Sequence, residues 1–395
     1  MTFEADASRQ LAELQARDLL RRPLTVTGRR GAEVEVAGQW LVNFSSNDYL
    51  GYADDPRICE AGARELARTG AGATASRLVV GNLQAHDDLE AELRSWLGVD
   101  GICLFNSGFA ANTGVLSALM GRGDVILSDR LNHASIIDGC KLSGATTRIY
   151  EHLACDDLER QLTEVASSGR SEQRVLVVTE SVFSMDGDRP DLVRIAALCE
   201  RFGAGLMVDE AHAMGVVGPA GRGECARVGV VPTLLVGTFG KALGVYGAFV
   251  ATTANLALLL WNRARSLVFT TGLPPAVVAM CSEAVRLVQG ADGDERRWLL
   301  QRNAGVVSGN RTMSASTNGD SLAYASGNRT HIVPVILGAE SAALAKAGAL
   351  RSAGMLVSAI RPPTVPMGTS RLRICLSSAH SVEQLLKLAQ VLEST

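Results

Sequence analysis

The stretch Leu206-Met207-Val208-Asp209-Glu210-Ala211-His212 is an apolar run that ends in a carboxylate, with a histidine three positions after it. A second apolar run, LLVGTF (234–239), is followed at once by Gly240 and Lys241. Short apolar runs with polar residues at their ends are typical of strands buried on both faces of a parallel sheet, whose carboxyl ends meet at a ligand-binding crevice. These two runs therefore predict strands that carry reactive side chains at one edge of a sheet.

Further apolar runs extend this pattern in both directions. Together they predict seven strands, at 101–106, 124–128, 146–150, 174–180, 204–210, 234–239 and 247–252. Apolar residues three and four apart, as over 89–97 and 192–202, predict helices in the gaps between the strands. Strands that alternate with helices predict an α/β fold with one seven-stranded, mostly parallel sheet.

The pattern changes after about residue 290, where a polar, Gly/Ser/Asn-rich stretch (308–330) interrupts the chain. A strand at 331–337, a helix at 341–354, a strand at 371–376 and a closing helix follow it. This order predicts a second, smaller C-terminal α/β domain. We therefore expect an N-terminal segment (1–50), a large domain (51–289) and a small C-terminal domain (290–395).

Composition excludes several classes of function. A chain of 395 residues with 47% hydrophobic content can bury a large core and form more than one domain. The net charge is −3 and no basic stripe with interleaved aromatic residues occurs, which argues against nucleic acid as a partner and favours small molecules. The first 20 residues are acidic and amphipathic, unlike a signal peptide, and no apolar run approaches the roughly 20 residues of a membrane span.

The eight cysteines are spread singly, without a C-x-x-C pair or a histidine at metal-binding spacing. We expect most of them to be reduced and to act as small hydrophobic residues of the core, and we expect no metal site. Reduced cysteines and the lack of an export signal favour the cytoplasm.

Lys241 lies in a Gly-bounded turn directly after a buried strand, where an ammonium can lose its proton and attack an aldehyde. The alternative is a surface lysine in a loop. Asp209 at a strand end can hold a pyridine ring protonated, and His212 can bond the oxygen of such a ring. The alternative is a helix cap followed by a surface histidine.

The junction from Asn106 to Asn112 offers a hydroxyl, Ser107, and a helix N-terminus, which suits a phosphate group. Ser107 as an ordinary N-cap is the alternative. His133 opens another helix after a strand and can stack on an aromatic ring, and the alternative is a capping histidine.

The order of these features, phosphate junction, stacking histidine, Asp-x-x-His and then lysine, resembles that of fold-type-I pyridoxal-phosphate (PLP) enzymes over nearly the whole chain. More narrowly, the sequence is similar to the α-oxoamine synthases. The motifs that carry this resemblance are NFSSNDYLG (43–51), TESVFSMDGD (179–188) and TFGK (238–241).

The resemblance implies a role for each cofactor-binding residue. Lys241 would hold PLP through a Schiff base, Asp209 would contact the pyridine nitrogen and His212 the phenolic oxygen, and His133 would stack over the ring. The residues expected around the phosphate and the phenolic oxygen are Ser107, Gly108, Phe109, Thr238 and Ser184.

For the substrates, the resemblance implies that Arg373 binds the carboxylate of the amino acid. Asn47 and Glu180 would be supporting polar contacts, and Arg21 and Thr364 would line the path of the acyl substrate. The chain departs from the family pattern at Ala75, Ala213 and Tyr246, and Tyr246 could narrow the site.

The segment AIRPPTVP (359–366) is similar to family members that use L-alanine and a pimeloyl thioester, and is less like those that use glycine. The resemblance thus implies a decarboxylative condensation in biotin synthesis, with coenzyme A or an acyl carrier protein as the thiol. It also implies a homodimer in which Phe269-Thr270-Thr271 reaches the neighbour's phosphate site. The alternatives are a glycine-using synthase, an alanine enzyme with another acyl thioester, and a catalytically silent protein with the same fold.

Overall fold

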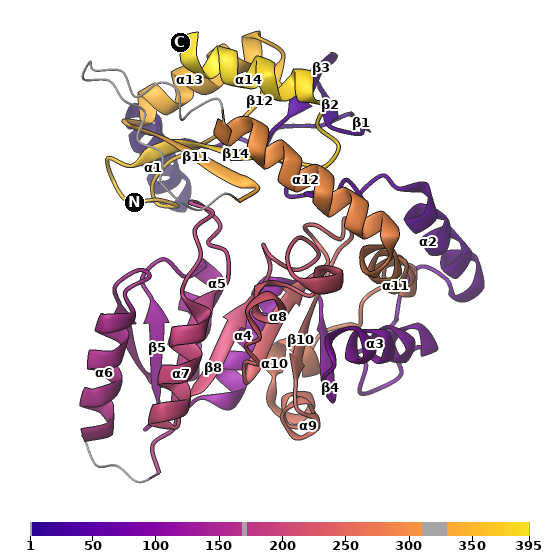
Figure 1. Cartoon of the computed structure of the whole chain (residues 1–395), viewed down its shortest axis with the longest axis vertical. Coiled ribbons are helices and arrows are strands. Elements are labelled where there is room, and N and C mark those ends of the chain that lie inside the picture. The colour runs from indigo at the N-terminus through magenta and orange to yellow at the C-terminus, as the bar shows by residue number, and fades with distance from the viewer. Residues whose placement is uncertain (1, 168–171, 310–329, 395) are drawn as a thin grey trace. The chain divides into compact units, whose positions relative to one another are not determined.

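The computed structural model describes residues 2–167, 172–309 and 330–394, so most of the polar stretch at 308–330 lies outside it. The chain forms two compact units (Figure 1). The large unit comprises Leu50–Ser184 and Asp188–Arg297, and the small unit comprises Met1–Tyr49, Met185–Gly187 and Trp298–Thr395.

The large unit is built on one seven-stranded sheet with the strand order β4-β10-β9-β8-β7-β5-β6. Its strands are β4 (Gly101–Phe105), β5 (Val125–Asp129), β6 (Thr146–Tyr150), β7 (Val175–Glu180), β8 (Gly205–Asp209), β9 (Leu234–Thr238) and β10 (Ala248–Thr252). Only β10 runs antiparallel to its neighbours. The predicted seven-stranded, mostly parallel sheet is confirmed, and each strand boundary agrees to within one residue.

Helices cover both faces of this sheet (Figure 1). They are α2 (Pro56–Thr69), α3 (Gln84–Leu97), α4 (Gly108–Leu119), α5 (Ala134–Ser143), α6 (Cys155–Ser167), α7 (Leu192–Phe202), the 3₁₀ turn η1 (Pro219–Gly221), α8 (Glu224–Val228), α9 (Ala254–Arg263), α10 (Arg265–Val268) and α11 (Pro275–Gln289). Leu176 and Val178 join one core cluster with α4, α5 and α9, whereas Val177 joins another with α6 and α7. Successive strand side chains point to opposite faces, so both faces need apolar residues, and the runs are continuously hydrophobic.

The small unit contains two small sheets. One has the order β1-β2-β3-β12 and the other β11-β14-β13. Their strands are β1 (Gly28–Arg30), β2 (Glu33–Val36), β3 (Gln39–Asn43), β11 (Ile332–Gly338), β12 (Met355–Leu356), β13 (Ser358–Ile360) and β14 (Ser370–Cys375), and the helices are α1 (Phe3–Ala16), α13 (Glu340–Ser352) and α14 (Val382–Ser394). Because β3 pairs in parallel with β12, the N-terminal segment and the C-terminal part of the chain fold into one unit.

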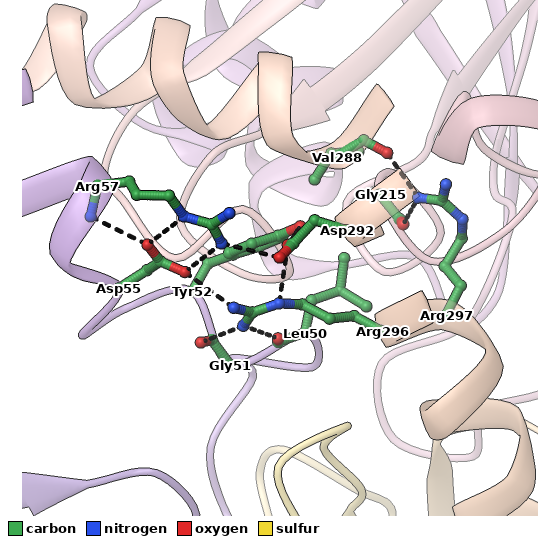
Figure 2. Close-up of polar contacts among 10 residues, drawn as sticks. All are labelled: Leu50, Gly51, Tyr52, Asp55, Arg57, Gly215, Val288, Asp292, Arg296 and Arg297. Carbon is green, nitrogen blue, oxygen red and sulfur yellow. Dashed lines mark hydrogen bonds and ion pairs between the residues drawn. The ribbon is translucent and has the colours of Figure 1, made fainter. Parts of the chain in front are cut away.

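Helix α12 (Ala291–Gly309) begins in the large unit, where arginines and carboxylates hold its first turns (Figure 2). The Arg296 guanidinium donates to the carbonyls of Leu50 and Gly51 at 2.8 and 2.7 Å. It also contacts the carboxylates of Asp55 and Asp292 at 2.8 and 3.0 Å. These contacts fix the last residues of the NFSSNDYLG motif and the chain that follows it.

All eight cysteines lie in the described residues, and none forms a disulfide; seven are buried and only Cys59 is exposed. The expectation of reduced, mostly buried cysteines is therefore confirmed. Within residues 2–167, 172–309 and 330–394, the helices are too short or too polar to cross a membrane.

Candidate active site

Lys241 is positioned by a tight turn at the carboxyl end of β9. The Thr238 hydroxyl donates to the carbonyl of Gly247 at 3.0 Å and accepts the N–H of Gly240 at 3.2 Å. The turn directs the Lys241 side chain toward His212, and its Nζ lies 2.8 Å from His212 Nε2. The lysine is half-buried and its amine contacts a buried histidine, unlike the exposed lysine that the surface-loop alternative expected.

The turn needs glycine at position 244. The backbone of Gly244 has φ +71°, and a Cβ atom there would lie 2.5 Å from the backbone nitrogen of Ala53. Tyr246, which follows in the same turn, leaves 57% of its side chain exposed.

Asp209 ends β8, next to β9, and is 6% exposed. Its Oδ1 accepts the N–H of Ala211 at 2.9 Å, and its Oδ2 accepts a hydrogen bond from Asn112 Nδ2 at 2.8 Å. Asp209 therefore caps the turn that follows β8, as the helix-cap alternative for this residue expected. His212, however, is buried at 4% exposure, so it is not the surface histidine of that alternative.

His133 is the N-cap of α5, as its capping alternative expected. Its Nδ1 lies 2.7 Å from Ser135 Oγ, and its backbone N–H donates to Glu180 Oε1 at 2.6 Å. Burial lowers the pKa of His133, an effect that Asp209 opposes and Lys241 reinforces. His133 therefore interacts electrostatically with both Asp209 and Lys241, which lie at the ends of β8 and β9.

Glu180 ends β7 and pairs in register with Asp209 of β8. Burial raises the pKa of Glu180 to about 8, and the neighbouring Asp209 carboxylate adds to this shift while Lys241 opposes it. The raised pKa favours the protonated form of Glu180 near neutral pH.

Ser107 is the N-cap of α4, and its Oγ accepts the N–H of Ala110 at 3.1 Å. A Cβ atom at Gly108 would meet nothing within 4 Å, so the start of the helix is open to a ligand. Phe109 is 48% exposed there. Nearby, Asn106 Nδ2 donates to the Thr270 hydroxyl at 3.0 Å. An open helix N-terminus with a hydroxyl suits a phosphate group.

These groups fit PLP by their chemistry. A lysine amine can react with the aldehyde, a buried carboxylate can face the pyridine nitrogen, and a helix N-terminus can bind the phosphate. Ser184 follows β7 on the same unit and is half-buried. Among the described residues, no group of three or more His, Cys, Asp or Glu side chains is arranged to hold a metal.

Four of the predicted substrate residues, Arg21, Asn47, Thr364 and Arg373, lie in the small unit. Arg373 on β14 is 7% exposed. Its Nη1 donates to Asn47 Oδ1 at 3.0 Å and contacts Cys375 Sγ at 2.9 Å, and its Nη2 lies 3.4 Å from the Tyr49 hydroxyl. Asn47 was expected as a supporting contact, whereas Tyr49 and Cys375 were not predicted.

Arg21 and Thr364 are direct neighbours in the small unit. Arg21 Nη2 donates to the carbonyls of Arg361 and Pro362 and to the Thr364 hydroxyl, at 3.0, 3.1 and 3.1 Å. Arg21 follows the end of α1 at Ala16, so it is not a helix charge, although it is exposed as that alternative expected. The guanidinium is instead anchored on the segment 359–366.

The structure thus collects the predicted residues in two places. The large unit holds Lys241, Asp209, His212, His133, Thr238, Ser107, Gly108, Phe109 and Ser184, and the small unit holds Arg21, Asn47, Thr364 and Arg373. Sequence reasoning assigned no role to Asn112 or Ser135. Asn112 is a buried polar residue in the otherwise apolar start of α4, and this contrast was a usable signal.

Comparison with known proteins places the chain among enzymes of this kind. Residues 40–392 match the family model described as aminotransferase class I and II. The chain is 47% identical over 379 residues to an 8-amino-7-oxononanoate synthase of Anaeromyxobacter dehalogenans, covering 95% of this chain and 92% of that protein. It is 43% identical over 378 residues to the 8-amino-7-oxononanoate synthase of Geobacter sulfurreducens, covering 95% and 94%.

The fold is similar to that of a lysine-to-alanine variant of serine palmitoyltransferase from S. paucimobilis with a bound PLP–myriocin aldimine. The TM-score is 0.91 at 29% identity, over 100% of this chain and 98% of that one.

Proposed function

The chain belongs to the aminotransferase class I and II family and, within it, to the 8-amino-7-oxononanoate synthases; from this premise we propose that it condenses L-alanine with a pimeloyl thioester. It is a PLP-dependent acyltransferase of biotin synthesis. The proposed products are 8-amino-7-oxononanoate, carbon dioxide and the free thiol. The observation that carries the proposal is the group formed by Lys241, His212, Asp209 and His133 at the carboxyl edge of the sheet, in which Asp209 and His212 are buried.

Bound PLP supplies an electron sink, which stabilises negative charge at the α-carbon of the amino acid. We assign the aldehyde of PLP to Lys241, its pyridine nitrogen to Asp209 and its phenolic oxygen to His212 and Ser184. The phosphate is assigned to Ser107, Gly108, Phe109 and Thr238. An ionised, hydrogen-bonded Asp209 favours a protonated pyridine.

Lys241 is the proposed base for the α-proton of alanine, because its amine is held in the site by His212. The alanine α-carbon then forms a bond to the thioester carbonyl carbon, and the thiol leaves with the electron pair of the broken C–S bond. Loss of the carboxylate as carbon dioxide and return of a proton to the α-carbon complete the reaction. His133 is the proposed donor to the acyl oxygen as it gains negative charge.

Arg373 is the proposed partner of the alanine carboxylate. Its contacts with Asn47 and Tyr49 orient the guanidinium on a rigid strand, which suits bidentate recognition of a carboxylate. Arg21 and Thr364 are proposed to contact the acyl chain. Arg21 donates three bonds from Nη2 alone, which leaves Nη1 and Nε for a distal carboxylate.

A homodimer is proposed as the working unit. The large unit exposes Leu78, Val79, Val80 and Phe269, at 56, 73, 71 and 72%. The two segments that carry them adjoin, since Gly272 N–H donates to the carbonyl of Ala75 at 3.0 Å. Exposed apolar side chains gathered in this way favour a subunit interface, and Thr270 and Thr271 are proposed to reach the neighbour's phosphate.

Unpaired cysteines support a cytoplasmic location.

The direct experiment incubates the PLP-loaded enzyme with pimeloyl-coenzyme A or the pimeloyl carrier protein, each with alanine and with glycine. Formation of 8-amino-7-oxononanoate with alanine is expected. A preference for glycine would support a glycine-using synthase. If both pimeloyl donors are inert and another acyl thioester reacts, the enzyme uses that acyl group instead. Failure to form any Schiff-base absorption with PLP would support the silent-protein alternative.

A further inference from the structure

A chain of buried hydrogen bonds links Asp209 to His133 inside the large unit. Asp209 Oδ2 accepts from Asn112 Nδ2 at 2.8 Å, and the same Nδ2 donates to Ser135 Oγ at 2.9 Å. Ser135 Oγ lies 2.7 Å from His133 Nδ1. Asn112 and Ser135 are 1% and 0% exposed, so water does not compete for these contacts. These hydrogen bonds therefore connect Asp209, which is assigned to the pyridine nitrogen, with His133, which is assigned to the acyl oxygen.

The direction of every bond in this chain follows from Asp209. An ionised carboxylate can only accept hydrogen bonds, so Asn112 must present its amide nitrogen to it. The second amide hydrogen of Asn112 then points to Ser135 Oγ, which accepts it. The single hydroxyl hydrogen of Ser135 is left to donate to His133 Nδ1.

The backbone of Ser135 supports the same direction. Its N–H also points at His133 Nδ1, at 3.2 Å. A nitrogen that accepts from two donors carries no proton, so the proton of the neutral ring is on Nε2. Among the described residues Nε2 makes no hydrogen bond to the protein, which leaves its N–H available to a ligand.

We propose that Asn112 and Ser135 are positioning residues that hold His133 as the neutral Nε2–H tautomer, which makes it a hydrogen-bond donor to the acyl carbonyl oxygen. The proposal rests on the proposed function, since it concerns the acyl step of that reaction. Asp209, which would hold the pyridine nitrogen of PLP, would thereby also fix the donor on His133 through the two neutral side chains of Asn112 and Ser135. A histidine in the other tautomer would present a lone pair to the acyl oxygen and repel it.

The competing interpretation is that the Asn112–Ser135 contact only packs α4 against α5. That role would affect stability but would not fix a proton on one ring nitrogen. The two interpretations therefore differ in the position of a hydrogen atom and in which kinetic step responds to mutation.

Neutron diffraction from deuterium-exchanged crystals of the holoenzyme locates the proton directly. We expect deuterium on Nε2 of His133, none on Nδ1, and the Ser135 deuteron directed at Nδ1. Deuterium on Nδ1 overturns the proposal, whatever the behaviour of any variant. This result does not depend on substrate turnover, so it stands even if the proposed substrates are wrong.

Kinetics of Ser135→Ala test the consequence. We expect kcat for condensation to fall about ten- to hundredfold, because a mixture of tautomers weakens one oxyanion donor. Exchange of the alanine α-proton in heavy water and the KM for alanine should stay within about twofold, because neither involves the acyl oxygen. The control is Ser117→Ala, which removes a hydroxyl of α4 that bonds only within its own helix, to the carbonyls of Thr113 and Gly114; it should change none of these values.

Equal losses of proton exchange and condensation in Ser135→Ala would favour the packing interpretation and overturn the proposal, as would an unchanged kcat. Asn112→Ala should lower both steps, because it removes a donor from Asp209 as well as from Ser135. A wild-type enzyme that neither exchanges the alanine proton nor condenses it contradicts the proposed function instead, and the neutron result then still decides the tautomer.

Discussion

Lys241 Nζ and His212 Nε2 lie 2.8 Å apart, although the two residues leave different strands of the sheet. At this distance one of the two nitrogens donates a hydrogen bond to the other. This contact positions the Lys241 amine, which we propose as the attachment point for PLP and as the base.

Lys241→Ala should abolish condensation while the protein still folds. The variant loses the covalent attachment of PLP and the proposed base together, so we expect kcat to fall more than about a thousandfold. Rate measurements under saturating substrates check this, with circular dichroism as the control for folding. A folded variant that retains more activity than this would assign the role to another group.

Asp209→Asn should still react with PLP but should fail to activate alanine. A neutral amide cannot stabilise a protonated pyridine, so the electron sink is weakened. The measurement is exchange of the alanine α-proton in heavy water, followed by NMR. Exchange at the wild-type rate would mean that the partner of the pyridine nitrogen lies elsewhere.

His152 should make the stability of the large unit depend on pH. Its Nδ1 and Nε2 lie 2.8 and 2.9 Å from carboxylate oxygens of Asp129 and Asp188, so both ring nitrogens must carry protons. Burial lowers the pKa of His152, but the hydrogen bonds to these two carboxylates outweigh it and raise the pKa to about 9.

The unfolded pKa of a histidine is about 6.5. The contribution of His152 to stability is therefore complete below about pH 6.5, falls as the pH rises, and is lost above the folded pKa of about 9. At full strength it is worth roughly 3 kcal/mol, from about 1.4 kcal/mol per pKa unit. Thermal unfolding of wild type and His152→Gln should differ most near pH 6 and converge near pH 10. A constant difference across this range would contradict the charged state.

The sheet could be predicted because strands buried on both faces need continuous apolar runs, and those runs are visible one element at a time. The three N-terminal strands β1, β2 and β3 were not predicted, since they are short and none is a continuous apolar run. The parallel pairing of β3 with β12 depends on residues from opposite ends of the chain, as in Val42 and Met355. No local pattern encodes such a pairing.

The residues of the candidate active site likewise divide into those that local sequence marks and those that only the fold brings together. Lys241, Asp209 and His212 follow apolar runs, and this position alone marks them. Asn112 reaches Asp209 across 97 positions of sequence, and its amide is significant only because the fold brings α4 beneath the end of β8. Roles that depend on contacts between elements, such as those of Asn112 and Ser135, therefore needed the structure.

Arg373→Ala should impair binding of alanine specifically. Removing a charge-assisted pair to a carboxylate costs about 1.5–3 kcal/mol, so the KM for alanine should rise about ten- to hundredfold. The KM for the pimeloyl thioester should change little. Steady-state kinetics with each substrate varied in turn give both values, and an unchanged KM for alanine would remove Arg373 from the amino acid site.

Arg21→Ala should have the opposite selectivity. Pimelate carries a distal carboxylate several methylenes from the thioester, and Arg21 has two guanidinium nitrogens that are not used by Arg361, Pro362 or Thr364. We expect the KM for the free-acid pimeloyl thioester to rise about tenfold, with the KM for alanine unchanged. Esterifying the distal carboxylate should remove most of the difference between variant and wild type, because no charge-assisted pair then remains to be lost. Arg22→Ala is the matched control, since it removes an equal charge from the next position, and it should leave both constants unchanged. If Arg21→Ala alters neither substrate's KM, its guanidinium only fastens the chain to the segment 359–366 and takes no part in binding the acyl group.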